Sequence, residues 1–472
     1  MKKRAALLLA VLCLAAALMP GCKRTDGERP TEPRPSVEVV PPETDPNALR
    51  VLIDFTTPGS TSHADHDVLE DFKKAIAEAG GPEDITFEYV FFDDSCERDS
   101  ENYALRGNEL TRVRTEIMAG KGPDIFITTC QPEYVDPVFK YPDQVMSRRA
   151  FLPLDGYIEN AQFMEWDKLT PAIMAAGKNE EGQQVLPLTY SLPLTVFRKT
   201  EVEHTHSQDL TLFDIAKSDN PVSLLFSERA TEFHTFWMDD DRFSSAFMEL
   251  ADYDTETLAF SEEELKEVIK TLGDLENRRV SGEFDNAPSY YHSNLEVDFN
   301  FNPGDDMYMA DKGGIGENER ITLFPLYSAQ GGYCATITSF AAINRNTKRP
   351  DDAFFVLDYL LSLECQCSEL YANLTFSRAI PTHEEAMQKR TKVIQYHATE
   401  GNKPKAWYLP KSNFEELCSL RDNITSARFR TELDKKLVNI LDRSKFLVGN
   451  EEALDREVHA AYMEMSMMLG ES

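Results

Sequence analysis

The chain has 472 residues, with 49 Lys and Arg against 81 Asp and Glu, and a formal net charge of -32 at pH 7. This length is sufficient for two domains with sizeable cores. So acidic a chain would repel nucleic acid, which we therefore exclude as a partner.

The N-terminal segment is typical of an export signal. Basic residues at positions 2–4 precede an apolar run over 5–19, which is too short for a comfortable membrane span. The run ends at Met19-Pro20-Gly21-Cys22, which resembles a lipobox. We predict a lipoprotein signal peptide over residues 1–21 with Cys22 as the lipidated residue. An ordinary secretory signal with an incidental Cys22 is the alternative.

Residues 22–49 follow without sustained apolar periodicity. Six prolines lie among charged residues between Lys23 and Leu49. Such a composition cannot bury enough apolar surface to fold, so we predict a disordered tether.

The next segments alternate between strand and helix patterns. Strands are expected over 50–55, 85–91 and 124–129, because these runs are short, apolar and rich in branched or aromatic residues. A helix with a capping box at Asp67 and Glu70 lies between the first two strands. A second helix, with Leu110, Val113 and Ile117 on one face, ends at a glycine stop. The order βαβαβ predicts a largely parallel sheet.

The third strand and its loop are the centre of the pattern. Gly120 supplies a helix stop, and Gly122-Pro123 prevents continuation of the helix. Cys130 and Gln131 follow the strand directly. Open α/β sheets bind their ligands beyond the carboxyl ends of strands, so this loop is a candidate binding element.

Four blocks in order carry a family resemblance. Residues 119–126 (AGKGPDIF), 152–155 (LPLD), 182–190 (GQQVLPLTY) and 340–363 resemble family 1 extracellular solute-binding proteins, the maltose-binding-protein-like receptors of ABC importers. The resemblance implies an α/β fold of the periplasmic-binding-protein-like type II, with two α/β lobes joined by a hinge and the ligand cleft between them.

The resemblance also implies interleaved domains. Lobe 1 is expected over residues 50–189 and 325–370, and lobe 2 over 190–324 and 371–472, with the last part helical. The chain would cross between lobes near Leu188 and Phe324. A single helix is expected over 351–370, where the apolar residues leave little polar face.

Ligand-binding residues follow by position from the matched blocks. The loop after the third strand points to Thr129 and Gln131, and the loop after the first strand points to Thr57. The first crossing points to Tyr190 and Ser191. The glycine-rich return to lobe 1 points to Tyr333.

Aromatic rings suit a sugar ligand, because sugar C–H faces stack on them. Trp237 lies in a polar setting early in the expected second lobe, and Trp407 lies in a loop bounded by prolines. We predict both at the floor of the cleft, with a structural core position as the alternative for each. Trp166 is expected in the core.

The functional expectation is a receptor that captures a sugar or oligosaccharide by hinge closure. It would be lipid-anchored outside the cytoplasm, act as a monomer, deliver the solute to ABC permease subunits and need no cofactor. A peptide or metal receptor is an alternative, the latter because of His63, His66, His204 and His206. A carbohydrate-active enzyme is another, although no G-x-S-x-G, H-E-x-x-H or P-loop motif is present.

Overall fold

The computed structural model describes part of the chain in detail. Its residues are 47–54, 63–90, 100–130, 136–192, 194–198, 211, 214, 249–281, 321–325, 327–328, 331–368, 371, 379–393, 398–400, 403–405 and 411–470. They all belong to one compact unit, Pro46–Ser472. The expected signal peptide and all but the end of the tether lie outside them.

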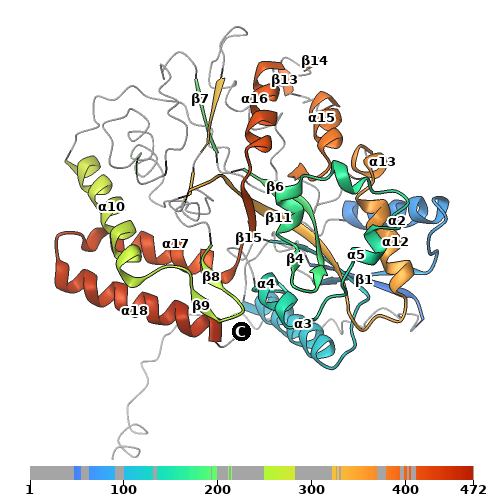
Figure 1. Cartoon of the computed structure of the whole chain (residues 1–472), viewed down its shortest axis with the longest axis horizontal. Coiled ribbons are helices and arrows are strands. Elements are labelled where there is room, and N and C mark those ends of the chain that lie inside the picture. The colour runs from blue at the N-terminus through green and yellow to red at the C-terminus, as the bar shows by residue number, and fades with distance from the viewer. Residues whose placement is uncertain are drawn as a thin grey trace, which may run out of the picture. The chain divides into compact units, whose positions relative to one another are not determined.

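A seven-stranded sheet is the main element of the unit (Figure 1). Its strand order is β12-β6-β11-β3-β1-β2, and β15 pairs with β11 as well. The strands are β1 (Leu49–Asp54), β2 (Ile85–Val90), β3 (Ile125–Thr129), β6 (Val185–Ser191), β11 (Cys334–Ile343), β12 (Ile380–Pro381) and β15 (Ser426–Phe429).

The three N-terminal strands pair as the sequence predicts. β1 is parallel to both β2 and β3. β11 lies antiparallel between β3 and β6, and every one of its residues is buried. The sheet is therefore mixed rather than parallel throughout.

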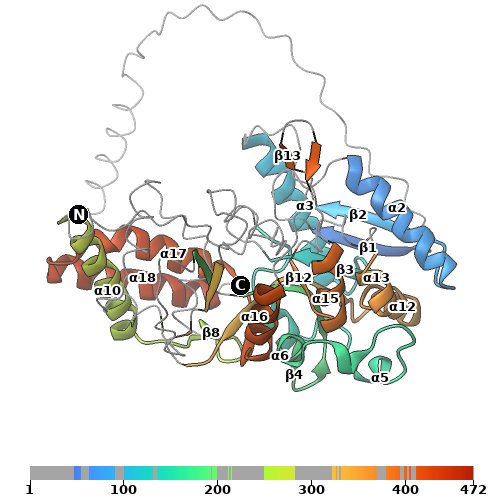
Figure 2. The same cartoon turned by 90° about the horizontal axis from the view of Figure 1, so that it is seen from above.

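Helices cover both faces of this sheet (Figure 2). On one face, Leu110 and Val113 of α3 (Ser100–Met118) share a buried cluster with Leu52 and Phe126. On the other, Val51 lies in a second cluster with apolar residues of α2 (His63–Glu78) and α12 (Pro350–Leu360). The N-terminal part of the unit is thus a three-layer α/β structure.

Helix ends agree with the sequence signals in part. α3 stops where predicted, with Gly120 at a φ of 70° that favours glycine. α2 begins at His63, a turn before the predicted cap at Asp67. The single helix expected over 351–370 is divided into α12 and α13 (Leu363–Gln366), because Ser362 caps α13 by accepting a hydrogen bond from the Cys365 amide.

The strand pair formed by β6 and β11 is connected along the chain to a second strand pair. β7 (Leu194–Arg198) follows β6 in the chain, and β10 (Ile321–Pro325) precedes β11. β7 and β10 pair antiparallel, as do β6 and β11. β7 and β10 therefore lie side by side, one directly after β6 and the other directly before β11, and we call β7 and β10 the paired connectors.

A group of helices forms the other large element. α10 (Glu262–Val280), α17 (Glu432–Ser444) and α18 (Glu451–Gly470) lie together at one side of Figure 1. Phe260 contacts Tyr462 of α18 edge-on at 6.2 Å between ring centroids, and Arg443 pairs with Glu457 at 2.6 Å.

Shorter elements complete the described residues. They are α4 (Pro142–Ser147), α5 (Asp155–Ile158), η1 (Trp166–Lys168), α6 (Pro171–Ala175), β4 (Lys178–Asn179), β5 (Gly182–Gln183), β8 (Ala251–Asp252), β9 (Thr257–Leu258), α15 (Glu384–Val393), β13 (Ala398–Glu400), β14 (Lys403–Lys405), α16 (Lys411–Asp422) and η3 (Lys445–Leu447). Within the described ranges, no helix combines the length and the apolar character that a membrane span requires.

The C-terminal part differs from the expected domain division. Residues 371–472 were expected to belong wholly to lobe 2, yet β12 and β15 of that range lie in the large sheet. Their side chains complete its core, because Phe429 packs edge-on against Phe340 with ring centroids 5.1 Å apart. α17 and α18 remain in the helical group.

Candidate functional site

One edge of the large sheet, where β3 and β6 end, is rich in hydroxyl residues. β3 ends in Thr128 and Thr129, β6 ends in Thr189-Tyr190-Ser191, and β11 begins with hydroxyl residues at 336, 338 and 339. Because β11 runs antiparallel to both neighbours, these segments meet: Ser339 is opposite Thr129, and Thr336 is opposite Ser191. We call this the hydroxyl edge.

The hydroxyl edge is internally hydrogen-bonded. The Thr189 hydroxyl lies 2.7 Å from the Thr338 hydroxyl and 2.5 Å from the Ser339 hydroxyl. The Cys130 amide donates to the Thr338 carbonyl at 2.8 Å. These bonds fix the ends of three strands relative to one another, at the point where the predicted ligand loop leaves β3.

A buried ion pair supports the same edge from β1. The Arg106 guanidinium donates to the Asp54 carboxylate at 2.7 Å, and their side chains are 2% and 1% exposed. Arg106 also donates to the carbonyls of Val90, at 3.1 Å, and Asp136, at 2.6 Å. The other carboxylate oxygen of Asp54 accepts from the Val138 amide at 2.6 Å.

This network holds a specific backbone segment. Arg114, two turns along α3 from Arg106, donates to the carbonyls of Pro137 and Val138 at 2.6 and 3.0 Å. Residues 136–138 are thereby fixed to α3 and β1. The predicted ligand loop after β3 is thus anchored at both ends, by the hydroxyl edge and by this network.

Tyr190 and Tyr333 lie next to the hydroxyl edge and are fully buried. Burial raises the pKa of both phenol groups, so both remain protonated at physiological pH. The Tyr333 hydroxyl has no hydrogen-bond partner among the described residues. Burying a donor without a partner costs free energy. Such unpaired groups are common at sites that bind a ligand or a water molecule.

A glycine turn positions Tyr333. Gly331 and Gly332 adopt φ values of 90° and 87°, and a Cβ atom at Gly332 would lie 2.4 Å from the Thr425 hydroxyl. The Tyr333 amide donates to that hydroxyl at 2.8 Å. Only glycine at 332 allows this approach, which explains the glycine pair that the sequence shows before β11.

The structure brings together three of the predicted ligand-binding residues, Tyr190, Ser191 and Tyr333. Ser191 is fully buried, and its hydroxyl donates to the Thr336 carbonyl at 3.5 Å. Thr129 ends β3 at the same edge. The other predicted residues lie outside the described ranges: Cys22, Thr57, Gln131, Trp237 and Trp407.

Sequence reasoning missed the Arg106–Asp54 pair and the hydroxyl residues that begin β11. A signal for the second was present, because Thr336 and Thr338 alternate with apolar residues shortly after the glycine pair and Ser339 follows. Trp166 packs against the core as expected.

The metal alternative rests on four histidines, and two of them, His204 and His206, lie outside the described ranges. Among the residues that the structure does describe, no group of three possible ligands surrounds a metal position. Burial raises the pKa of the Cys365 thiol.

No protein-family model matches the chain, and no curated protein matches its sequence. Solved structures match most of its length. A family 1 extracellular solute-binding protein from Alicyclobacillus acidocaldarius is 13% identical, with a TM-score of 0.52 over 89% of this chain and 98% of its own. A periplasmic oligogalacturonide binding protein from Yersinia enterocolitica is 12% identical, with a TM-score of 0.52 over 89% and 99%.

A third similar structure is the cyclic alpha-maltosyl-1,6-maltose binding protein from Arthrobacter globiformis. It is 13% identical, with a TM-score of 0.50 over 90% of this chain and 100% of its own. The chain therefore has the α/β fold of the extracellular solute-binding proteins, of periplasmic-binding-protein-like type II. The expected fold class is confirmed.

Proposed function

We propose that this chain is the extracytoplasmic substrate-binding component of an ABC transporter, and that it captures a sugar or oligosaccharide and delivers it to permease subunits. The hydroxyl edge beside the paired connectors carries this proposal. Structures of the same fold bear the names of an oligogalacturonide and a cyclic maltosyl-maltose binding protein, which supports the carbohydrate class.

The chemistry of the edge favours a neutral, polyhydroxylated solute. Its buried charged pair, Arg106 and Asp54, is satisfied internally. The remaining groups are hydroxyls that both donate and accept hydrogen bonds, as sugar hydroxyls do. These described hydroxyl groups carry no charge that would attract a metal ion or a strongly charged solute.

The proposed ligand-binding residues are those named from the sequence. Thr57, Thr129, Gln131, Tyr190, Ser191 and Tyr333 would supply polar contacts, and Trp237 and Trp407 would supply stacking surfaces. Closure would occur about the paired connectors, between a first lobe built on the large sheet and a second lobe containing α10, α17 and α18. Contacts from both lobes would then favour the closed state when solute is present.

A thermal-shift screen tests the function. A ligand that binds only the native state raises its stability by RT ln(1 + [L]/Kd), about 2.7 kcal/mol at a hundredfold excess over Kd. We expect at least one oligosaccharide to raise the melting temperature, with monosaccharides, oligopeptides and divalent metal ions as the comparison set. Stabilisation by a peptide or a metal ion alone would overturn the carbohydrate proposal.

The same samples test the proposal that the chain is not an enzyme. Incubation with the stabilising oligosaccharide should release no new reducing ends. Their appearance in proportion to protein concentration would favour glycoside hydrolysis instead.

We also propose that the protein is anchored to the membrane through lipid on Cys22 and acts as a monomer. Cys22→Ser should abolish partition into the membrane fraction and leave the melting temperature of the folded unit unchanged, because Cys22 precedes that unit. A wild-type protein recovered wholly in the soluble fraction with a free Cys22 thiol would contradict the anchor.

A further inference from the structure

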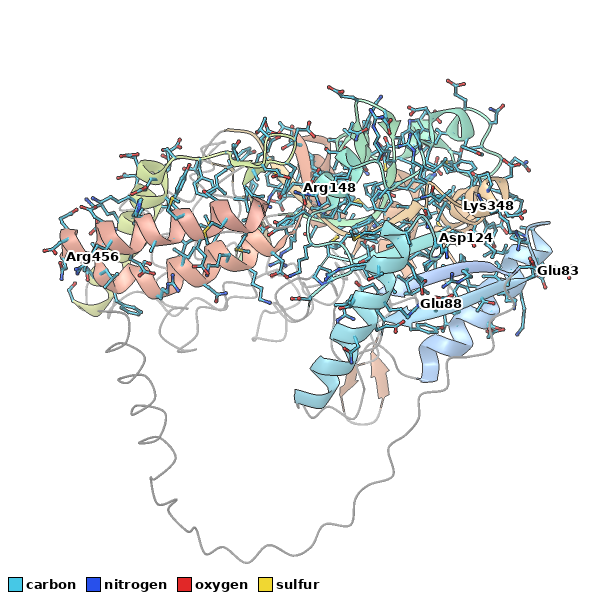
Figure 3. The ribbon with its side chains drawn as sticks, turned by 90° about the horizontal axis from the view of Figure 1, so that it is seen from below. Glu83, Glu88, Asp124, Arg148, Lys348 and Arg456 are labelled. Carbon is cyan, nitrogen blue, oxygen red and sulfur yellow. The ribbon has the colours of Figure 1, made fainter. Side chains whose placement is uncertain are left out.

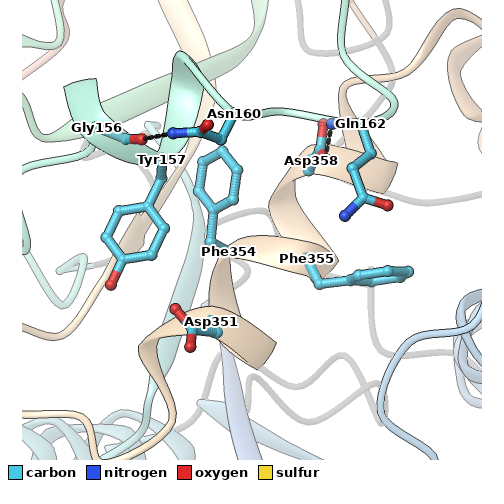
Figure 4. Close-up of a pocket in the computed structure, with 8 residues that line it drawn as sticks. All are labelled: Gly156, Tyr157, Asn160, Gln162, Asp351, Phe354, Phe355 and Asp358. Atoms are coloured by element: carbon cyan, nitrogen blue, oxygen red, sulfur yellow. Dashed lines mark hydrogen bonds between the residues drawn. The ribbon is translucent and has the colours of Figure 1, made fainter.

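A cavity of about 330 Å³ lies between α5 and α12, on the helical layer of the large sheet (Figure 4). It is lined by Gly156, Tyr157, Asn160, Gln162, Asp351, Phe354, Phe355 and Asp358. None of these residues belongs to the hydroxyl edge. The volume is in the range of pockets that hold small ligands.

Aromatic rings form much of its wall. Tyr157 and Phe354 lie 5.2 Å apart between ring centroids with planes 35° apart, and Phe355 packs edge-on against Phe163 at 5.2 Å. Figure 4 shows Phe354 between Tyr157 and Phe355. Ring faces carry negative electrostatic potential, so such a wall attracts cations.

The two carboxylates of the cavity differ in their contacts. Asp358 accepts the backbone amides of Gln162, Phe163 and Met164 at 2.7 to 3.1 Å and is therefore fully occupied. Asp351 has no ion-pair partner among the described residues. It lies in the first turn of α12 and is exposed.

The nearest basic residue before α12 is used elsewhere. The Arg349 guanidinium pairs with Asp84 at 2.7 Å and with Asp352 at 2.8 Å. It therefore does not neutralise Asp351. Burial raises the pKa of the Tyr157 hydroxyl, and the negative charge of Asp351 raises it further, which indicates that the two groups lie close together.

We propose that this cavity binds an organic ammonium group, held against its aromatic wall beside Tyr157 and neutralised by Asp351. The site is separate from the proposed solute site, and the inference does not depend on the transport function. Its ligand would be a small amine with a positively charged nitrogen and an apolar surround.

Choline chloride is the probe, compared with 3,3-dimethylbutan-1-ol, which has the same shape without the charge. Saturation-transfer NMR on the full chain, at ionic strength matched with sodium chloride, should detect choline. Choline should bind at least about tenfold more tightly than the neutral alcohol, since charge is the feature that the cavity recognises. Equal binding of the two probes, or no transfer to choline, would overturn the proposal.

Two substitutions and a matched control test whether choline binds in this cavity. Asp351→Asn and Tyr157→Leu should each weaken choline binding by about fivefold or more. Asp352→Asn is the control, because Asp352 is the next residue of the same helix turn but pairs with Arg349. It should change choline binding less than about twofold. An Asp351→Asn variant that binds choline like the wild type would show that the cavity is not the site.

Discussion

Replacing Arg106 with Ala should lower the free energy of unfolding by about 3 to 5 kcal/mol. The substitution leaves the Asp54 carboxylate buried without its counter-charge, and breaking a buried pair on one side typically costs this amount. It also removes donors from the Val90 and Asp136 carbonyls. Urea denaturation followed by circular dichroism measures the change.

Arg112→Ala on the same helix is the control. Arg112 pairs with Glu109 and Glu116, and its side chain is 40% exposed, so its loss should cost about 0 to 1 kcal/mol. The double variant with Arg106→Met and Asp54→Leu should recover only part of the loss, because no unpaired charge remains but the Val90 and Asp136 carbonyls and the Val138 amide lose these partners. If Arg106→Ala and Arg112→Ala unfold at the same urea concentration, the buried network does not stabilise the edge as described.

Asp143→Asn should stabilise the protein at pH 8 by about 2 kcal/mol. Asp143 lies at the start of α4, where burial raises the pKa of its carboxyl from 3.8 to about 7. Glu249 and Asp254 raise it further, against the opposing effect of Arg428. Arg428 pairs with Asp434 at 2.5 Å, so its charge is shared.

The sign follows from proton linkage. The folded state holds the Asp143 proton more tightly than the unfolded state, so stability falls as the pH rises from about 4 to about 7. One pKa unit is worth about 1.4 kcal/mol, and the full shift would be worth roughly 4 kcal/mol. Because the side chain keeps partial exposure, we expect about half of that.

Denaturation at several pH values tests this expectation. Asp143→Asn and the wild type should have nearly equal stability at pH 4 and differ at pH 8. Asp167→Asn, at an exposed position of η1, should leave the pH profile unchanged. A wild-type profile that rises between pH 4 and pH 8 in parallel with that of Asp143→Asn would contradict the assignment.

α4, the helix that carries Asp143, contacts α18 of the helical group and the loop between β8 and β9. Gln144 donates to Glu256 at 3.3 Å and to the Leu469 carbonyl at 3.4 Å, and Arg148 pairs with Glu256 at 3.2 Å. Figure 3 labels Arg148 at this junction and Arg456 on α18. A charge change at Asp143 therefore acts where α4 meets the β8–β9 hairpin and α18.

Local signals in the sequence were enough for the N-terminal elements. Alternation and apolar runs predict β1, β2 and β3, because each strand depends on its own side chains. Gly120 predicts the end of α3, because a helix often ends at a residue of positive φ, which glycine adopts without strain, and the φ of Gly120 is indeed positive. The fold class followed from the four family-like blocks.

Pairs of residues that are distant in the chain could not be predicted from local sequence signals. β15 pairs with β11 across about ninety residues of chain, and no local pattern in residues 426–429 indicates that partner. The same holds for Arg106 and Asp54, which are 52 positions apart. Tyr190, Ser191 and Tyr333 were named through the family resemblance, whereas their burial and the bonds around them required the structure.

Small-angle X-ray scattering of the full chain, with and without the oligosaccharide that gives the largest thermal shift, tests the central claim most directly. Capture by closure about the paired connectors predicts a smaller radius of gyration at saturating sugar and an unchanged molecular mass. Superimposable scattering curves at a sugar concentration that stabilises the protein would contradict capture by closure.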